Sequence, residues 1–356
     1  MQKSLLAKIV CPLDKGTLSI APGAREEGLH VMEGYLSCDT CGKSYLIRDG
    51  IPHLIPGDFS SIGPRELEEV QAKTADRFGF EWRLFKDWGW LESLPDVPGA
   101  EEKFRGALFE NSQNAFWAKS LFEKKDLGPG CLVLDAGCGN GRTTKVVAET
   151  GAEVISIDLG DGVRSAFEHM REMPNVHIVK GNLFSLPFPE KLFDRIFSIG
   201  VLMHTGDAEK AFKSIRKALA PEGLFVAHVY GKGMPRYEMI DKYLRMVTTR
   251  LSIGNQVRFA KLMAKIARWL RRGGKKRTNL YYRLYPYLTI LPTEHHMFDW
   301  WSAPVASHHT IEEVCGWFEK ESLSIVKTNP PRGNKPMIDA NIRNHGAITV
   351  LGRAEQ

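Results

Sequence analysis

The sequence predicts an α/β protein with a largely parallel sheet, a small β-rich unit in front of it and a helical insert within it. Three observations support this prediction: apolar runs alternate with helical stretches after Cys131, a glycine-rich loop follows the first run, and cysteines cluster near the start of the chain. With 356 residues, 43% of them hydrophobic, the chain can bury at least one full-sized core. We expect five regions, at 1–57, 58–126, 127–230, 231–300 and 301–356.

The first region contains Cys11 and the pair Cys38 and Cys41, and it closes on a segment rich in proline and glycine. Turn residues at this density predict a small β-rich unit. Paired thiols in a reducing compartment hold a metal more often than they oxidise. Zinc prefers two Cys-x-x-Cys pairs but also accepts carboxylate oxygen, so the candidate ligands are Cys11, Asp14, Cys38 and Cys41.

Residues 58–126 follow a helical pattern with an aromatic cluster, and we interpret them as a linker that packs on the core. The apolar runs at 131–137, 153–160, 176–182, 193–200 and 224–231 predict strands with helices between them. One helix is expected over 207–223, stopped by Pro221 and Gly223. The alternation breaks past Tyr230, and 323–329 and 346–354 are expected to be strands that complete the sheet.

The loop after the first predicted core strand places Gly137, Gly139 and Gly141 at alternate positions. The first backbone N–H groups of the following helix are unpaired and attract a polar or anionic ligand, and glycines would let that ligand approach the main chain. The spacing is not the Gly-x-Gly-x-x-Gly of dinucleotide binding, and no Gly-Lys-Ser/Thr follows. Asp135, just ahead of the loop, would repel a pyrophosphate but could reach an ammonium group.

This arrangement closely resembles motif I of the class I S-adenosylmethionine-dependent methyltransferases, and the resemblance extends over roughly residues 128–230. It implies a Rossmann-like, seven-stranded methyltransferase sheet with S-adenosylmethionine as cofactor. Asp158 would hold the ribose hydroxyls, and Asn182 stands where the family usually has an Asp at the adenine amino group. The core residues expected to contact the cofactor are Asp135, Gly137, Cys138, Gly139, Asp158, Leu159, Asn182, Leu183 and Gly200.

The segment 75–85 is similar to one that precedes the catalytic core in relatives with the same N-terminal module. Phe80 and Trp82 are expected either to cover the cofactor, excluding water, or to dock the linker on the core. The N-terminal segments resemble the Trm112-like zinc ribbon, which occurs fused to methyltransferases or as their partner. His30 or His53 could complete the zinc set, and a ribbon that has lost its metal is the open alternative.

Methyl transfer requires alignment of nucleophile, methyl and sulfur and, for a hydroxyl or amine, removal of a proton. His204 follows the fourth predicted core strand, at the sheet edge where ligands bind, so it is the first candidate for a general base. Packing beside the cofactor is the alternative role. His228 and Tyr230 are further candidates, and residues 293–301 are expected to line a substrate pocket or to form an aromatic packing cluster.

The net charge of +6 arises in one segment, because Lys242 to Thr293 contain thirteen basic and no acidic residues. A helix is predicted there, with bases on one face and an apolar stripe on the other made by Phe259, Leu262, Met263, Ile266, Trp269 and Leu270. We expect the stripe to pack on the core as a lid. The basic face over 257–283 is then solvated, or it binds an acidic carrier protein, an anionic membrane surface or RNA.

We therefore expect a cytoplasmic enzyme that methylates a small molecule or a carrier-bound metabolite. No apolar run approaches the roughly 18 residues of a membrane span, and the start of the chain does not match a secretory signal. An RNA methyltransferase is the alternative, because zinc ribbons also precede this fold in enzymes that methylate ribosomal RNA. A module that binds the cofactor without catalysis is the third hypothesis.

Overall fold

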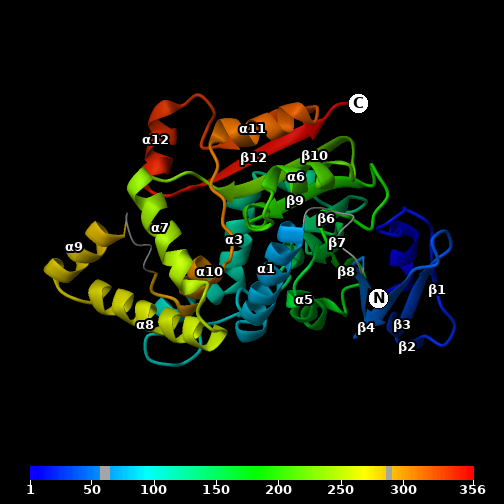
Figure 1. The fold of residues 1–356 in the computed structure, drawn as a ribbon, viewed down its shortest axis with the longest axis horizontal. Helices are drawn as coiled ribbons and strands as arrows, with labels where there is room; N and C mark the ends of the chain where they lie inside the picture. Colours follow the sequence, from blue (N-terminus) through cyan, green and yellow to red (C-terminus); the bar gives the residue numbers. More distant parts are fainter. Residues whose placement is uncertain (57–64, 286–290) are drawn as a thin grey trace.

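The computed structural model describes residues 1–56, 65–285 and 291–356. Their strands form one continuous sheet, which is packed between helices (Figure 1). Its parallel centre has the spatial order β8-β7-β6-β9-β10, formed by β6 (Leu132–Ala136), β7 (Glu153–Asp158), β8 (Val176–Gly181), β9 (Phe193–Ile199) and β10 (Leu219–Tyr230). β12 (Ala347–Ala354) pairs antiparallel with β10, and β11 (Leu323–Asn329) pairs antiparallel with β12. These seven strands confirm the predicted α/β sheet, and the two terminal strands complete it as expected.

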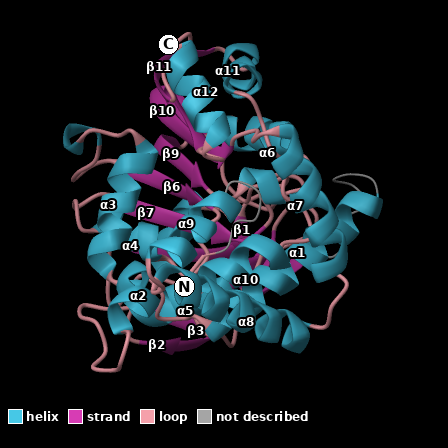
Figure 2. Ribbon diagram, turned by 90° about the vertical axis from the view of Figure 1, so that its left-hand side faces the viewer, coloured by secondary structure: helices cyan, strands magenta, loops and turns pink. Residues whose placement is uncertain are grey.

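Helices cover both faces of the parallel strands, which Figure 2 shows as one twisted stack. α3 (Phe109–Ser120), α4 (Arg142–Ala148) and α5 (Gly162–Met170) pack on one face, and α6 (Ala208–Arg216) and α11 (Ile311–Lys320) pack on the other. The central positions of β7 are buried without alternation, because a strand covered on both faces has no solvent side. Two separate apolar layers result, one on each face of the sheet.

The helix predicted over 207–223 is shorter than expected. α6 ends at Arg216, and Pro221 and Gly223 lie within β10, where the pairing with β9 is irregular between Leu219 and Leu224. Proline has no N–H to give to a sheet ladder, so it fits this irregular stretch of strand. The prediction that these two residues stop the helix is therefore wrong, because the chain has already become extended.

The N-terminal unit contains β1 (Leu18–Ile20), β2 (Arg25–Glu27), β3 (His30–Cys38), β4 (Ser44–Arg48) and β5 (Ile51–Leu54). β5 pairs antiparallel with β4 and parallel with β8, so it belongs to the small unit and to the main sheet at once. The Gln2 side chain donates hydrogen bonds to the carbonyls of Met173 and Val176 across the same junction. The small unit therefore extends the central sheet.

The remaining α-helices lie outside the two layers that cover the sheet, and Figure 1 shows those of residues 235–284 on the side away from the N-terminal strands. They are α1 (Arg65–Leu84), α2 (Ala100–Phe104), α7 (Pro235–Thr248), α8 (Ile253–Arg271), α9 (Lys275–Leu284) and α10 (Glu294–Ser302), with α12 (Lys335–Arg343) near the C-terminal strands. None of the helices in the described part of the chain is long and apolar enough to cross a membrane.

The apolar face of α8 differs from the predicted stripe. Its fully buried positions include Ala260, Ala264 and Ala267, whereas Leu262 and Trp269 are 55% and 57% exposed. The buried alanines pack in one cluster with Met297, Phe298 and Trp301 of α10. Small side chains allow two helices to approach closely, so the alanine face of α8 packs on α10, and Leu262 and Trp269 remain exposed to solvent.

Candidate functional site

A cavity of about 1440 Å³ lies at the carboxyl ends of the five parallel strands. One residue at each strand end lines it, namely Gly137, Asp158, Asn182, Gly200 and Tyr230 after β6 to β10 in turn. The opposite wall comes from α1, α3, residues 95–102 and α10. The carboxyl edge of such a sheet is where α/β proteins bind ligands, and the added helices turn this edge into a deep pocket.

The glycine loop adopts left-handed backbone conformations, with φ of +100°, +55° and +82° at Gly137, Gly139 and Gly141. A Cβ on Gly137 would lie 2.4 Å from Val201, and one on Gly139 would lie 2.8 Å from Nε1 of Trp82. Backbone conformation and the protein's own side chains thus account for these glycines. The backbone at Gly137 to Asn140 also lines the cavity, so the close approach of a ligand to this loop stays a prediction.

Two aspartates lie beside this loop in different surroundings. Asp158 lines the cavity and accepts hydrogen bonds from the backbone N–H groups of Gly139, at 3.0 Å, and Gly160, at 2.7 Å. Asp135 lies behind the loop, 1% exposed, and accepts from the Thr144 hydroxyl at 2.7 Å. Burial raises the pKa of Asp135 to about 7. Asp135 is therefore placed to hold the first turn of α4, and Asp158 faces the cavity.

The other core residues expected to contact a cofactor also line the cavity: Cys138, Leu159, Asn182, Leu183 and Gly200. The amide of Asn182 is already engaged, because its Nδ2 donates to Gln71 of α1 at 2.8 Å and its Oδ1 accepts from the N–H of Phe184 at 2.9 Å. A carbonyl oxygen has two lone pairs, so Oδ1 can still accept one further hydrogen bond.

α1 brings its aromatic residues to the cavity unevenly. Trp82 lines the cavity, and the guanidinium of Arg142 lies 5.0 Å from the centre of its ring. Phe80 points elsewhere and packs on Phe298 of α10, with ring centres 5.9 Å apart. Phe78 lines the cavity in its place, 5.0 Å from the ring of His204. A helix turns about 100° per residue, so Phe80 and Trp82 cannot share one face.

The three candidate catalytic residues meet at the same wall of the cavity. His204 is 5% exposed, and its Nδ1 lies 2.6 Å from the carbonyl of Val305, which makes Nδ1 the donor and leaves Nε2 as an acceptor. Burial lowers the pKa of His204 to about 4 and that of His228 to about 3. Tyr230 lies edge-on to His204, at 5.4 Å between ring centres. Both histidines are therefore neutral at pH 7.

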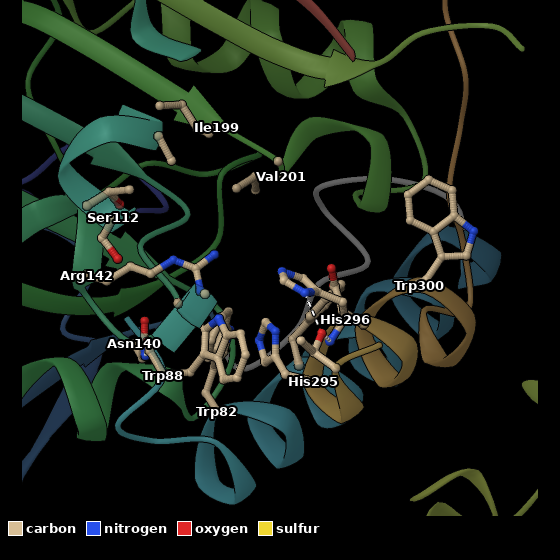
Figure 3. Close-up of a pocket in the computed structure, with 18 of the residues that line it drawn as sticks. Trp82, Trp88, Ser112, Asn140, Arg142, Ile199, Val201, His295, His296 and Trp300 are labelled. Carbon is tan, nitrogen blue, oxygen red and sulfur yellow. Dashed lines mark hydrogen bonds between the residues drawn. The ribbon is translucent and has the colours of Figure 1, made fainter. Parts of the chain in front are cut away.

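Two ionisable side chains, one in the cavity wall and one behind it, were not predicted individually; Figure 3 shows the first, His295. Glu81 of α1 is fully buried, and its Oε1 lies 3.1 Å from Nε2 of His295, which stacks on Trp88 at 4.4 Å. Burial raises the pKa of Glu81 and lowers that of His295, so both tend to their neutral forms. A carboxylate between Phe80 and Trp82 in an aromatic segment was the available signal. The prediction that residues 293–301 line the pocket holds for Thr293, His295, His296, Asp299 and Trp300.

The N-terminal cysteines converge on a second site. One donor atom each from Cys11, Asp14, Cys38 and Cys41 lies within 4.8 Å of the others. Three sulfurs and one carboxylate oxygen at this separation fit a tetrahedral Zn²⁺ site. His30 and His53, the alternative ligands, lie elsewhere: His30 packs against Phe167, at 5.2 Å, and His53 is in β5.

Comparison with known proteins gives two family matches. Residues 134–227 match a methyltransferase domain model, and residues 2–50 match the Trm112p-like protein model. The first match lies within the central sheet and the second within the N-terminal unit. The methyltransferase match contains the glycine loop and the strand ends that line the cavity, and the Trm112p-like match contains the four candidate zinc ligands.

Curated relatives cover only part of this chain. It is 30% identical over 176 residues to 24-methylenesterol C-methyltransferase 3 of Arabidopsis thaliana, which is 46% of each chain. It is 35% identical over 129 residues to phosphoethanolamine N-methyltransferase 2 of Caenorhabditis elegans, or 35% of this chain and 29% of that protein. The chain thus spans less than half the length of either relative.

A solved structure with a similar course of chain is the complex between the Haloferax volcanii Trm112 methyltransferase activator and the putative methyltransferase. The identity is 12%, the TM-score is 0.41, and the match covers 76% of this chain and 98% of that one.

The buried His204 makes stability depend on pH. Its folded pKa of about 4 lies below the ordinary value of 6.5, so its contribution is complete above pH 6.5 and is lost as pH falls towards 4. We expect His204→Gln to lower the free energy of unfolding most at neutral pH, and the difference from wild type to shrink by roughly 3 kcal/mol by pH 4. Denaturant unfolding at several pH values measures this. A difference that is constant across the range contradicts it.

The zinc site can be tested through its carboxylate ligand. We expect the purified protein to contain one zinc per chain, Asp14→Ala to lose most of it, and Asp14→Cys to keep it, because a thiolate is the usual fourth ligand. Elemental analysis after dialysis measures the zinc content. Asp39→Ala, on an exposed neighbouring residue, is the matched control. Equal zinc in the Asp14→Ala and control proteins would exclude Asp14 as a ligand.

Proposed function

We propose that this protein is an S-adenosylmethionine-dependent methyltransferase that acts on a small molecule or a carrier-bound metabolite. The observation that carries the proposal is the position of Asp158, which ends β7 at the cavity wall and is tied to the glycine loop within the matched methyltransferase domain. The names of the relatives, a sterol C-methyltransferase and a phosphoethanolamine N-methyltransferase, support an acceptor of low molecular mass.

The residues at the sheet edge fit the cofactor chemically. Asp158 keeps free carboxylate lone pairs for the ribose hydroxyls, and Asn182 keeps one acceptor lone pair for the adenine amino group. Asp135 would act on the methionine ammonium through the loop, because it does not itself reach the cavity. Trp82 would exclude water above the loop, and Phe80 takes no part. When bound, the cofactor supplies an electrophilic methyl group.

The rest of the cavity is large enough for a second molecule. Ligand pockets usually measure about 300–1,000 Å³, and this one exceeds that range. The rest of the wall holds aromatic rings, among them Trp88, Tyr230 and Trp300, together with His295, which is backed by the buried Glu81. A concave compartment lined by aromatic rings suits a compact acceptor. RNA methylation therefore remains the second hypothesis.

His204 is the residue we assign to proton removal from a hydroxyl or amine acceptor. The Val305 carbonyl fixes its tautomer, and Phe78 and Tyr230 hold its ring at the cavity wall. Its neutral Nε2 is an acceptor at physiological pH, but its pKa of about 4 lies below the near-neutral value at which a general base is most effective, so proton removal by His204 depends on its position in the cavity wall. The transfer itself depends mainly on alignment, since an in-line displacement needs no covalent intermediate on the protein.

Cofactor binding tests the assignment of Asp158. We expect calorimetry to give roughly 10- to 100-fold weaker binding of S-adenosylmethionine to Asp158→Asn, because hydrogen bonds to a charged group contribute about 1.5–3 kcal/mol. Asp161→Asn is the control, since Asp161 pairs with Lys180 and does not line the cavity. If the folded wild-type chain gives no heat with S-adenosylmethionine or its demethylated product, the proposal fails.

The acceptor class is tested by incubating the protein with methyl-labelled cofactor and a fractionated extract. We expect label in the low-mass fraction, and label in RNA would replace our proposal by the second hypothesis. His204→Gln should lower the labelling rate about 100-fold, as loss of a general base does, while cofactor affinity stays within a few-fold of wild type. Unchanged turnover in this variant would leave His204 a packing residue.

A further inference from the structure

The outward faces of α7, α8 and α9 expose large apolar side chains. These helices lie together at the left of Figure 1, and Figure 2 views the molecule from that side. Exposed fractions range from 42% to 63% for Met239, Tyr243, Met246, Val247, Leu262, Trp269, Leu280 and Tyr282. Eight such residues on three consecutive helices exceed what scattered surface apolar residues would give, and concentrated apolar surface of this kind marks a contact site.

The same faces are basic. Their exposed cations are Arg236, Lys242, Arg250, Arg258, Lys261, Lys265, Arg271, Arg272, Lys275, Lys276 and Arg283. Of these, Arg272 pairs with Glu102 of α2. Lys242 to Thr293, which include all of α8 and α9, contain no acidic residue. The positive charge of α8 and α9 is therefore not balanced within these two helices. We call these apolar and basic side chains together the α7–α9 face.

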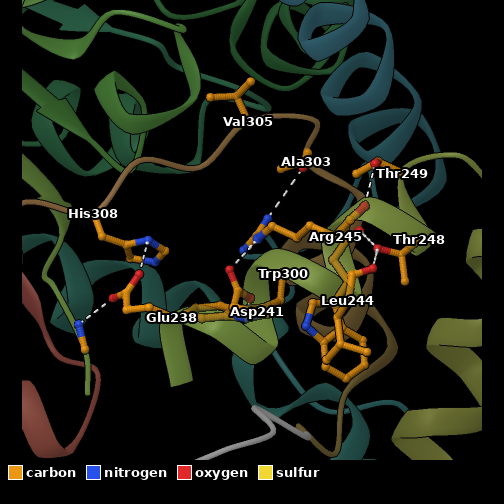
Figure 4. A network of polar contacts seen from close by, with 12 residues as sticks. Glu238, Asp241, Leu244, Arg245, Thr248, Thr249, Trp300, Ala303, Val305 and His308 are labelled. Atoms are coloured by element: carbon orange, nitrogen blue, oxygen red, sulfur yellow. Dashed lines mark hydrogen bonds and ion pairs between the residues drawn. The ribbon is translucent and has the colours of Figure 1, made fainter. Parts of the chain in front are cut away.

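The two acidic residues of α7 point inward, as Figure 4 shows. Asp241 is 4% exposed, accepts from Nε of Arg245 at 2.7 Å, and accepts from Nε1 of Trp300 at 3.2 Å. Glu238 accepts from the N–H of Gly233 and lies 3.2 Å from Nδ1 of His308. These contacts fix the rotation of α7 about its axis, so its outer side carries only neutral and cationic groups.

α8 places its apolar and basic groups side by side. Leu262 lies between Lys261 and Lys265 in the sequence of α8. Trp269 follows one helical turn after Lys265, and the guanidinium of Arg277 of α9 lies 4.6 Å from the centre of the Trp269 ring. A tryptophan flanked by cations on an exposed helix face is typical of segments that rest at the level of lipid headgroups. The alanine face on the opposite side of α8 holds the helix on α10.

We propose that the α7–α9 face docks on the surface of an anionic phospholipid bilayer. The cations meet lipid phosphates, and the exposed Met, Leu, Val and aromatic side chains enter the boundary between headgroups and acyl chains. The face adjoins the cavity, because Arg271 and Arg272 at the end of α8 also line it. Docking therefore brings this side of the cavity towards the membrane, and it does not depend on the methyl-transfer reaction.

A bilayer accounts for this surface better than the other polyanions. RNA recognition uses cationic side chains together with aromatic rings on which the bases stack. It gives no role to four exposed aliphatic side chains, those of Met239, Met246, Val247 and Leu262. An acidic protein would bind through ion pairs between particular residues. A lipid surface, whose headgroups can move, is bound by the total positive charge and the total apolar area of the face. Clustered aliphatic residues beside clustered cations are explained by a partner that has a charged surface and an apolar interior.

Vesicle flotation tests the proposal on the full chain. We expect the protein to float with vesicles of phosphatidylcholine and phosphatidylglycerol at low salt, at least tenfold more than with phosphatidylcholine alone, and less at high salt. Leu262→Ser with Trp269→Ser, and separately Lys261→Gln with Lys265→Gln, should each reduce the floated fraction several-fold. The matched controls are Leu29→Ser with Tyr35→Ser, and Lys43→Gln with Lys73→Gln, which change exposed residues elsewhere and should float like wild type.

A fluorescence measurement keeps the test independent of folding losses. Trp269 should shift its emission to shorter wavelength when anionic vesicles are added, and this shift should disappear in Trp269→Phe, which retains an apolar ring. Flotation equal for both lipid compositions, or unchanged in both α8 double variants, overturns the proposal. So does binding to RNA in gel shifts without any binding to vesicles. None of these results bears on affinity for S-adenosylmethionine, so they are distinct from failure of the proposed function.

Discussion

The carboxylate of Asp158 fixes the geometry on which the candidate site depends. It accepts hydrogen bonds from the backbone N–H groups of Gly139 and Gly160, and these two bonds connect the loop after β6 to the turn after β7. Parallel strands bring their carboxyl ends to one edge, which places residues distant in sequence within one cavity. Because the loop is also closed by Trp82 and Val201, the site is set by packing as much as by hydrogen bonds.

The helical insert supplies the other half of the cavity. α10 brings His295, Asp299 and Trp300 to the cavity, and α1 adds Trp82 to the wall and Glu81 behind His295. These ionisable groups are buried together, and burial moves the pKa of Glu81 and of His295 towards the neutral forms. The cavity wall therefore combines aromatic rings with both neutral and charged polar groups. The outer side of the same insert is cationic and apolar, so one set of helices has two different surfaces.

The Trm112p-like domain is part of the central sheet. β5 continues its small antiparallel sheet onto β8, which is the strand that leads to Asn182. The adenine side of the proposed cofactor site is therefore connected to the unit that contains the candidate zinc ligands through two adjacent strands and a shared apolar core.

The sequence by itself determined the strand pattern, because this depends on local periodicity. It also determined the glycine loop, the four candidate zinc donors and the strand-end residues of the cavity, because each belongs to a motif within one segment. Only the tertiary structure decided which side of each helix is buried. It turned Phe80 away from the cavity and Phe78 towards it, buried the alanines of α8 instead of Leu262 and Trp269, and paired Glu81 with His295 across more than two hundred residues. These outcomes depend on which distant surface each helix meets, and no local pattern contains that information.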